Sequence, residues 1–116
     1  MAALVFAATI VIQVFLAGVA LANLGGSGDF SAHREFGYTA VGLAWLVLLL
    51  TGLAARRPRA ELGFALLLLV LYIVQTALPN LRSSAPLVAA LHPVNALFLF
   101  GLAAWYARRT GQMQTA

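Results

Sequence analysis

The chain has 116 residues, of which 63% are hydrophobic and only 9% are charged. A soluble domain carries about 25% charged residues, so this chain has too little polar surface to cover a water-soluble globule, and lipid is the natural solvent for its outer face. All seven basic residues are arginines, but they lie at the ends of apolar stretches, which disfavours nucleic acid as a partner. The absence of cysteine excludes thiol redox chemistry, thiolate-bound iron–sulfur clusters and covalent c-type haem attachment.

Four apolar stretches are each long enough for a membrane-spanning helix, which needs about 20 residues. The first has no basic segment before it and is expected to remain as a span rather than to be cleaved. The sequence therefore predicts one all-α transmembrane domain over 1–116, with spans over 3–23, 32–55, 61–78 and 85–107.

The breaks between these spans contain helix-ending and helix-capping residues. A glycine-rich segment precedes Asp29 and Ser31, which are expected N-caps of the second span. A basic turn surrounds Pro58, and Ser83 or Ser84 is expected to cap the fourth span. Short connections of this kind predict an antiparallel up-down-up-down bundle.

The placement of the arginines predicts the orientation of the bundle. The side opposite the predicted cytoplasmic face has only Arg34 and Arg82, beside Asp29 and Glu35. The positive-inside rule therefore places both termini in the cytoplasm, in a multi-pass protein of a bacterial cytoplasmic (inner) membrane. The cytoplasmic arginines are Arg56, Arg57, Arg59, Arg108 and Arg109.

Strongly polar side chains within the spans are few, and such groups need partners in a membrane. They are Gln13, His33, Gln75, His92 and Asn95. Because no acid or base lies in the middle of a span, proton-coupled transport through a buried carboxylate is disfavoured, and a small-solute transporter is a weak alternative.

The two histidines are predicted to lie on the outer half of the second and fourth spans, which are parallel and commonly diagonal in such a bundle. Two neutral imidazoles that face each other can ligate one haem iron from opposite sides. Gly37 would leave room for the macrocycle beside His33, and Arg34 and Arg82 would pair with the haem propionates. Aromatic side chains would wall the site: Phe36, Tyr38, Phe98 and Phe100.

Structural alternatives compete with this interpretation. Each histidine alone is also typical of an interfacial residue or of a helix–helix hydrogen bond. Gln13 and Gln75 are expected to bond across helices or to line a quinone or haem edge, and Asn95 to orient His92 or to satisfy a carbonyl freed by Pro93. A height difference also opposes shared ligation, because His33 lies about seven residues farther from the inner end of its span than His92, or roughly 10 Å. Tilt, or a kink at Pro93, would reduce that difference.

Three segments resemble one four-helix unit of the haem A synthase family: IQVFLAG at 12–18, HREFGYTAVGL at 33–43 and LHPVNALFLFGLA at 91–103. The chain also resembles small uncharacterised four-span bacterial membrane proteins with the same histidine pair. The resemblance implies that His33 and His92 are axial haem ligands. The family has a glutamate three residues before the first histidine, where this chain has Phe30, so oxygenation of a haem methyl group is not expected.

The sequence therefore predicts a b-type haem protein that works in electron transfer or haem handling, with no catalytic residue assigned. The expected partners are lipid, haem, and a second copy of the chain or a larger membrane redox complex. The alternative is a non-catalytic membrane subunit, or a quinone-binding or packing protein, without haem.

Overall fold

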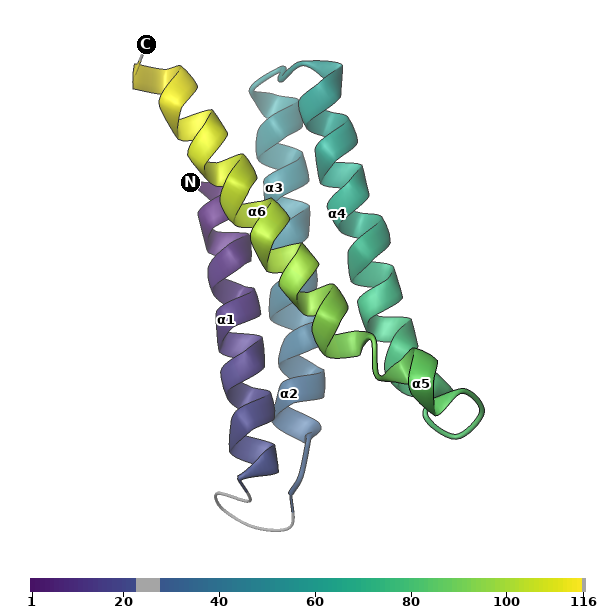
Figure 1. The fold of residues 1–116 in the computed structure, drawn as a ribbon. Coiled ribbons are helices and arrows are strands. Elements are labelled where there is room, and N and C mark those ends of the chain that lie inside the picture. The colour runs from purple at the N-terminus through teal and green to yellow at the C-terminus, as the bar shows by residue number, and fades with distance from the viewer. Residues whose placement is uncertain (23–27, 116) are drawn as a thin grey trace.

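A computed structural model describes the backbone of residues 1–22 and 28–115 and the side chains of residues 1–22 and 28–111. Every regular element in these ranges is helical (Figure 1). Four helices are long and apolar enough to cross a membrane: Ala2–Leu21, Ser31–Ala54, Arg59–Leu81 and Pro86–Gly111. This pattern is that of a multi-pass membrane protein, as predicted. The predicted end of the first span, at Asn23, lies outside the described residues.

The first span is one helix, and each of the other three is built from more than one element. The first span is α1 (Ala2–Leu21). The second consists of α2 (Ser31–Phe36), the π-helix η1 (Gly37–Val41) and α3 (Gly42–Ala54). The third joins α4 (Arg59–Ala77) to the 3₁₀-helix η2 (Leu78–Leu81). The fourth consists of the short α5 (Pro86–Ala89) and α6 (His92–Thr115).

The capping predictions are wrong for both spans: Phe30 is the N-cap of α2, and no side chain caps that helix. The Asp29 carboxylate accepts hydrogen bonds from the Ser31 backbone N–H (2.8 Å) and the Ser31 hydroxyl (2.7 Å). These bonds, the side-chain one first, lower the pKa of Asp29. The serine cap predicted for the fourth span is wrong: Ala85 occupies that position and no side chain caps α5. Pro86 occupies the first helical position instead, where its missing N–H costs little.

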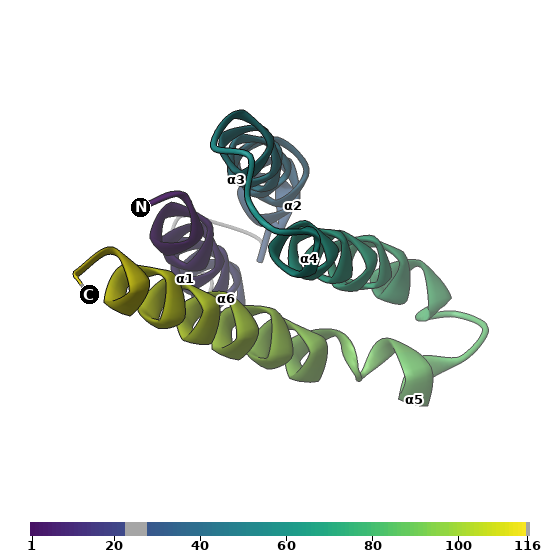
Figure 2. The same cartoon turned by 90° about the horizontal axis from the view of Figure 1, so that it is seen from above.

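The second and fourth spans lie on opposite corners of the bundle. Seen from above, α1 and α4 each lie between these two spans (Figure 2). The start of α1 and the last turns of α6 lie toward the same end of the molecule as the turn between α3 and α4 (Figure 1). The histidine-bearing starts of α2 and α6 therefore lie toward the other end.

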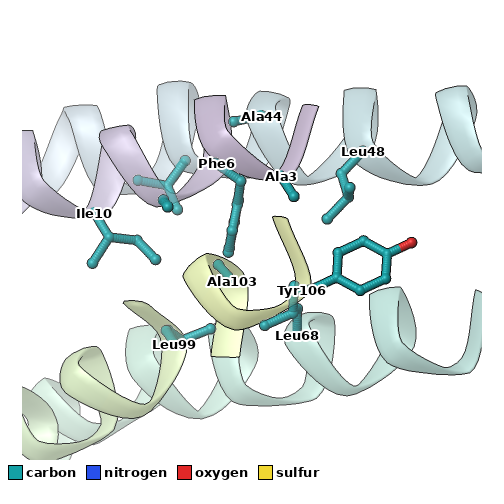
Figure 3. Packing of buried hydrophobic residues seen from close by; sticks show 11 residues of the cluster. Ala3, Phe6, Ile10, Ala44, Leu48, Leu68, Leu99, Ala103 and Tyr106 are labelled. Carbon is teal, nitrogen blue, oxygen red and sulfur yellow. The ribbon is translucent and has the colours of Figure 1, made fainter. Parts of the chain in front are cut away.

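The apolar core fills the half of the bundle that contains the termini. Phe6, Leu68 and Leu99 are its largest fully buried side chains, and α1, α3, α4 and α6 all contribute to it (Figure 3). Two polar contacts reinforce this half. The Trp45 indole N–H donates to the Ala65 carbonyl across α3 and α4 (2.8 Å), and the Tyr106 hydroxyl donates to Glu61 across α6 and α4 (2.9 Å).

The half that carries the histidines is much less tightly filled by side chains. Within 11–22, 28–40 and 69–98, only Ala20, Leu78 and Asn95 are buried. Polar contacts between helices, rather than an apolar core, hold this half together. The polar side chains that meet in this half are therefore the candidates for a functional site.

Candidate functional site

Gln13 of α1 and His33 of α2 form a reciprocal pair, in which each side chain bonds to the backbone carbonyl of the other residue. The His33 Nδ1 lies 2.9 Å from the Gln13 backbone carbonyl, which can only accept. The ring therefore carries its proton on Nδ1 and leaves a lone pair on Nε2. The Gln13 side-chain amide donates to the His33 backbone carbonyl at 2.7 Å and lies 3.4 Å from His33 Nε2.

Gln75 of α4 and His92 of α6 repeat this arrangement in the second half of the chain. The His92 Nδ1 lies 2.9 Å from the Gln75 backbone carbonyl, and the Gln75 amide nitrogen lies 3.2 Å from His92 Nε2. Asn95, which is buried, donates to the Gln75 side-chain oxygen at 2.7 Å and to the Leu71 carbonyl at 2.8 Å. The Asn95 amide thus anchors the side chain that faces His92.

The structure brings the two histidine rings together between the diagonal spans. Their centroids lie 6.0 Å apart, with an angle of 70° between the ring planes. The expected height difference of roughly 10 Å is therefore wrong. Its cause was the predicted end of the fourth span at Ala107, since α6 begins at His92 and continues for 24 residues to Thr115.

The fourth span is broken rather than kinked beside its histidine. Helix α5 ends at Ala89 and α6 begins at His92, with Pro93 as its second residue. A proline in the first turn of a helix removes no intrahelical hydrogen bond, so Pro93 suits a helix start. This break sets the position of His92 independently of the helix that precedes it.

Gly37 has a different role from the one predicted. A Cβ atom at this position would lie 2.6 Å from the Gln13 amide nitrogen. The space beside Gly37 is therefore occupied by the amide that binds the His33 carbonyl, not left open for a macrocycle. Phe30 lies against His33 in an edge-to-face contact, with centroids 6.0 Å apart.

The two outer arginines occupy unlike positions. Arg34 is exposed on α2, and its positive charge helps to lower the pKa of Asp29. Arg82 is also exposed but lines a hollow of about 370 Å³ that includes His92, between the end of the third span and the start of the fourth.

The aromatic wall predicted for the site is mostly absent from the described structure. Phe36 packs against the buried core, but Tyr38, Phe98 and Phe100 are exposed. In a membrane-spanning helix such exposed aromatic side chains face lipid or another protein. The hydropathy pattern cannot reveal this, because these helices are apolar on nearly every face.

The two histidines by themselves would suit only a metal that brings most of its own ligands. An imidazole–metal bond is about 2 Å long, so two rings on opposite sides of one metal have centroids about 6 Å apart. Across 1–22 and 28–115, no three metal-binding side chains of the His, Cys, Asp and Glu types come together. The two Nε2 lone pairs would suit haem, whose macrocycle supplies the other ligands, but a glutamine amide nitrogen lies 3.4 Å from His33 Nε2 and 3.2 Å from His92 Nε2. The Gln13 side-chain oxygen is buried without a partner in the described structure, so this region is not fully satisfied by protein groups alone.

The pairing of glutamine with histidine is the main feature that sequence reasoning missed. Both glutamines were expected to bond across helices, and they do. Their partners were not predicted, although a signal exists: each glutamine precedes its histidine across one inter-span connection, as 13 precedes 33 and 75 precedes 92.

The chain belongs to a family of unknown function, DUF6220, whose family model matches residues 13–81. The matched segment contains Gln13, His33 and Gln75, while His92 and Asn95 lie beyond it. No curated protein and no solved structure matches the chain.

Proposed function

We propose that the protein holds one b-type haem between His33 and His92 and serves in electron transfer or haem handling. The observation that carries the proposal is the meeting of two imidazoles from diagonal spans, 6.0 Å between centroids. Both rings have the tautomer that a metal requires, because a backbone carbonyl accepts from each Nδ1. Haem bound there supplies a one-electron couple.

The protein's own residues have defined tasks in this proposal. His33 and His92 would hold the iron through Nε2, while the backbone carbonyls of Gln13 and Gln75 keep the protons on Nδ1. These bonds orient the rings and raise the basicity of the ligating nitrogens. Arg82, which lines the same hollow as His92, would pair with a propionate. Arg34 belongs to the proposal only as a second, more distant cation.

The setting of this site is also part of the proposal. Both termini and the arginine-rich turn at 56–59 face the cytoplasm of a bacterial inner membrane, and the histidines lie toward the outer side. The surrounding partners are lipid and either a second copy of the chain or a larger redox complex. A relationship to one haem A synthase unit is compatible with this role, whereas haem oxygenation is not proposed because Phe30 replaces the family's glutamate.

One observation favours a second function without haem. The amide nitrogen of each glutamine faces the Nε2 of its histidine, so each pair also joins two neighbouring helices through hydrogen bonds. The protein would then be a packing subunit, or would bind a quinone among these amides.

The test is the absorbance spectrum of the full chain, purified from haem-supplemented cells. We expect a sharp reduced α-band from a six-coordinate haem, and we expect His33→Ala and His92→Ala each to abolish it. Tyr38→Phe, which alters an exposed side chain, is the control and should leave the band unchanged. A colourless protein, or a band that survives both histidine substitutions, would favour the packing function.

A further inference from the structure

The end of the bundle opposite the histidines has more positive charge than its own acidic side chains can balance. Glu61 is the only aspartate or glutamate of the sequence at this end. Within 1–22 and 28–111, the one ion pair joins Glu61 to Arg57, at 3.8 Å. Four exposed arginines at the same end therefore have no acidic side chain to pair with: Arg56, Arg59, Arg108 and Arg109.

The helix dipoles do not supply the missing negative charge at every one of these positions. Arg59 is the first residue of α4, at the end of a helix where the dipole is positive. A cation is unfavourable there unless an anion lies nearby. The charge at this end of the bundle therefore calls for an anion from outside the chain.

Aromatic contacts hold the last turns of α6 beside the first turn of α4. The Tyr106 hydroxyl donates to Glu61 (2.9 Å), and the Phe64 ring stacks on the Tyr106 ring, with centroids 4.8 Å apart. Phe64 also contacts Trp105, with centroids 5.6 Å apart. Trp105 thus lies at the level where the third span begins. Half-exposed tryptophans at the ends of spans are typical of the membrane–water interface, so this level is that of the lipid headgroups.

Arg109 is held at this level by Trp105. Its guanidinium carbon lies 5.4 Å from the centroid of the indole ring, which is a cation–π contact. A guanidinium that stacks through its face keeps the N–H donors along its edge available, and two of them can bind one phosphate in parallel. Because the contact already restricts the side chain, less conformational entropy is lost when an anion binds.

We infer that the Arg109 guanidinium, stacked on Trp105, binds the phosphate of an anionic phospholipid of the phosphatidylglycerol type. Arg108 and Arg59 add to the attraction without contacting Trp105 in the described structure. A net negative lipid is favoured over a zwitterionic one, because the ammonium group of the latter offsets its phosphate. The bound headgroup fixes the depth of the third and fourth spans in the membrane. This inference goes beyond the proposed haem site and does not depend on it.

The experiment uses Trp105 as its reporter. The chain has two tryptophans, so Trp45→Phe leaves Trp105 as the single source of indole fluorescence. The full chain is placed in phosphatidylcholine vesicles, and quenching by acyl-brominated phosphatidylglycerol is compared with quenching by acyl-brominated phosphatidylcholine. We expect a relative association constant of about fivefold in favour of phosphatidylglycerol, the effect of about one charge near the membrane surface. This preference should decrease as salt is added. Equal quenching by the two lipids would overturn the inference.

Three variants separate a stacked guanidinium from general attraction to positive charge. Arg109→Gln should reduce the preference to less than about twofold, because it removes the charge beside Trp105. Arg109→Lys keeps the charge but loses the planar fork, so its preference should lie between those two values. Arg57→Gln is the matched control: it removes the same charge from an arginine that Glu61 already pairs, and it should keep most of the preference.

Equal effects of Arg57→Gln and Arg109→Gln would contradict a site at Trp105, as would an unchanged preference in Arg109→Lys. Circular dichroism checks that every variant is folded. If Trp45→Phe does not fold, native mass spectrometry of the unsubstituted chain with both lipids gives the same comparison. A colourless protein that prefers phosphatidylglycerol would overturn the proposed haem function alone, whereas a haem-containing protein without this preference would overturn only the lipid site.

Discussion

Gly37 is the residue whose side-chain size most directly controls the Gln13–His33 pair. An added Cβ would lie 2.6 Å from the Gln13 amide nitrogen, which is closer than real contacts allow. A Cβ atom added to Gly18, on α1, would have no other atom within 4 Å. The two glycines therefore separate the effect of lost space from the general effect of adding a methyl group to a helix.

We predict that Gly37→Ala is less stable than Gly18→Ala by about 1 kcal/mol, the net worth of one hydrogen bond. Both variants gain the same helical preference of alanine, but only Gly37→Ala displaces the Gln13 amide from the His33 carbonyl. The measurement is reversible unfolding in mixed micelles, followed by circular dichroism. Equal stabilities of the two variants would mean that the amide moves at no cost.

At the scale of the element, η1 explains how the second span is held beside the third. In a π-helical segment the backbone hydrogen bonds are shifted, and such segments often occur at functional sites. The Tyr72 hydroxyl of α4 lies 3.0 Å from the Gly37 carbonyl and 3.3 Å from the Tyr38 carbonyl. Gly42 makes room for this hydroxyl, since a Cβ there would lie 3.1 Å from its oxygen. A side chain from one helix therefore supports the irregular backbone of another.

We predict that Tyr72→Phe destabilises the protein by about 1 kcal/mol, because it removes the hydroxyl and leaves the ring in place. Amide hydrogen exchange should speed up mainly within η1 and the residues that follow it. Tyr38→Phe is the control, since its side chain is exposed and should affect neither measurement. A uniform increase in exchange along the second span would argue against a local role for Tyr72.

The sequence predicts the spans better than the irregularities within them. The predicted starts at 32 and 85 lie one residue from the observed Ser31 and Pro86, because hydropathy measures the length of an apolar helix. The π-helical segment was not predicted, because it depends on a hydroxyl from another helix. The break before His92 likewise escaped prediction, since a proline alone does not distinguish a kink from a new helix start.

The residues of the candidate site could be predicted from the sequence, but the contacts between them could not. Polar residues in apolar spans need partners, so Gln13, His33, Gln75, His92 and Asn95 could all be selected from the sequence. Which of them meet depends on how each helix is rotated about its axis. Spans that are apolar on nearly every face carry little information about that rotation, so the exposed positions of Tyr38 and Phe98 were not predictable.

At the scale of the whole molecule, the two ends of the bundle differ in charge and in packing. Arg56, Arg57 and Arg59 surround the turn at the end that holds the termini and the apolar core, and Arg108 and Arg109 lie in the last turns of the fourth span. The histidine end has Arg34 and Arg82, with Asp29 and Glu35 offsetting them. The proposed orientation follows from this asymmetry, and it places the haem nearer the outer surface.

The chain contains no cysteine, so a single introduced cysteine is the only thiol that a labelling reagent can modify, and this orientation can be tested with such variants. Ala55→Cys and Ser84→Cys place thiols at exposed positions on opposite ends of the bundle. In intact spheroplasts, a membrane-impermeant maleimide should label Ser84→Cys at once and Ala55→Cys only after permeabilisation, because arginine-rich loops stay in the cytoplasm. The unsubstituted chain should remain unlabelled throughout. The opposite pattern would reverse the orientation and place the histidines on the cytoplasmic side, whereas labelling of both sites in intact spheroplasts would contradict a fixed single orientation.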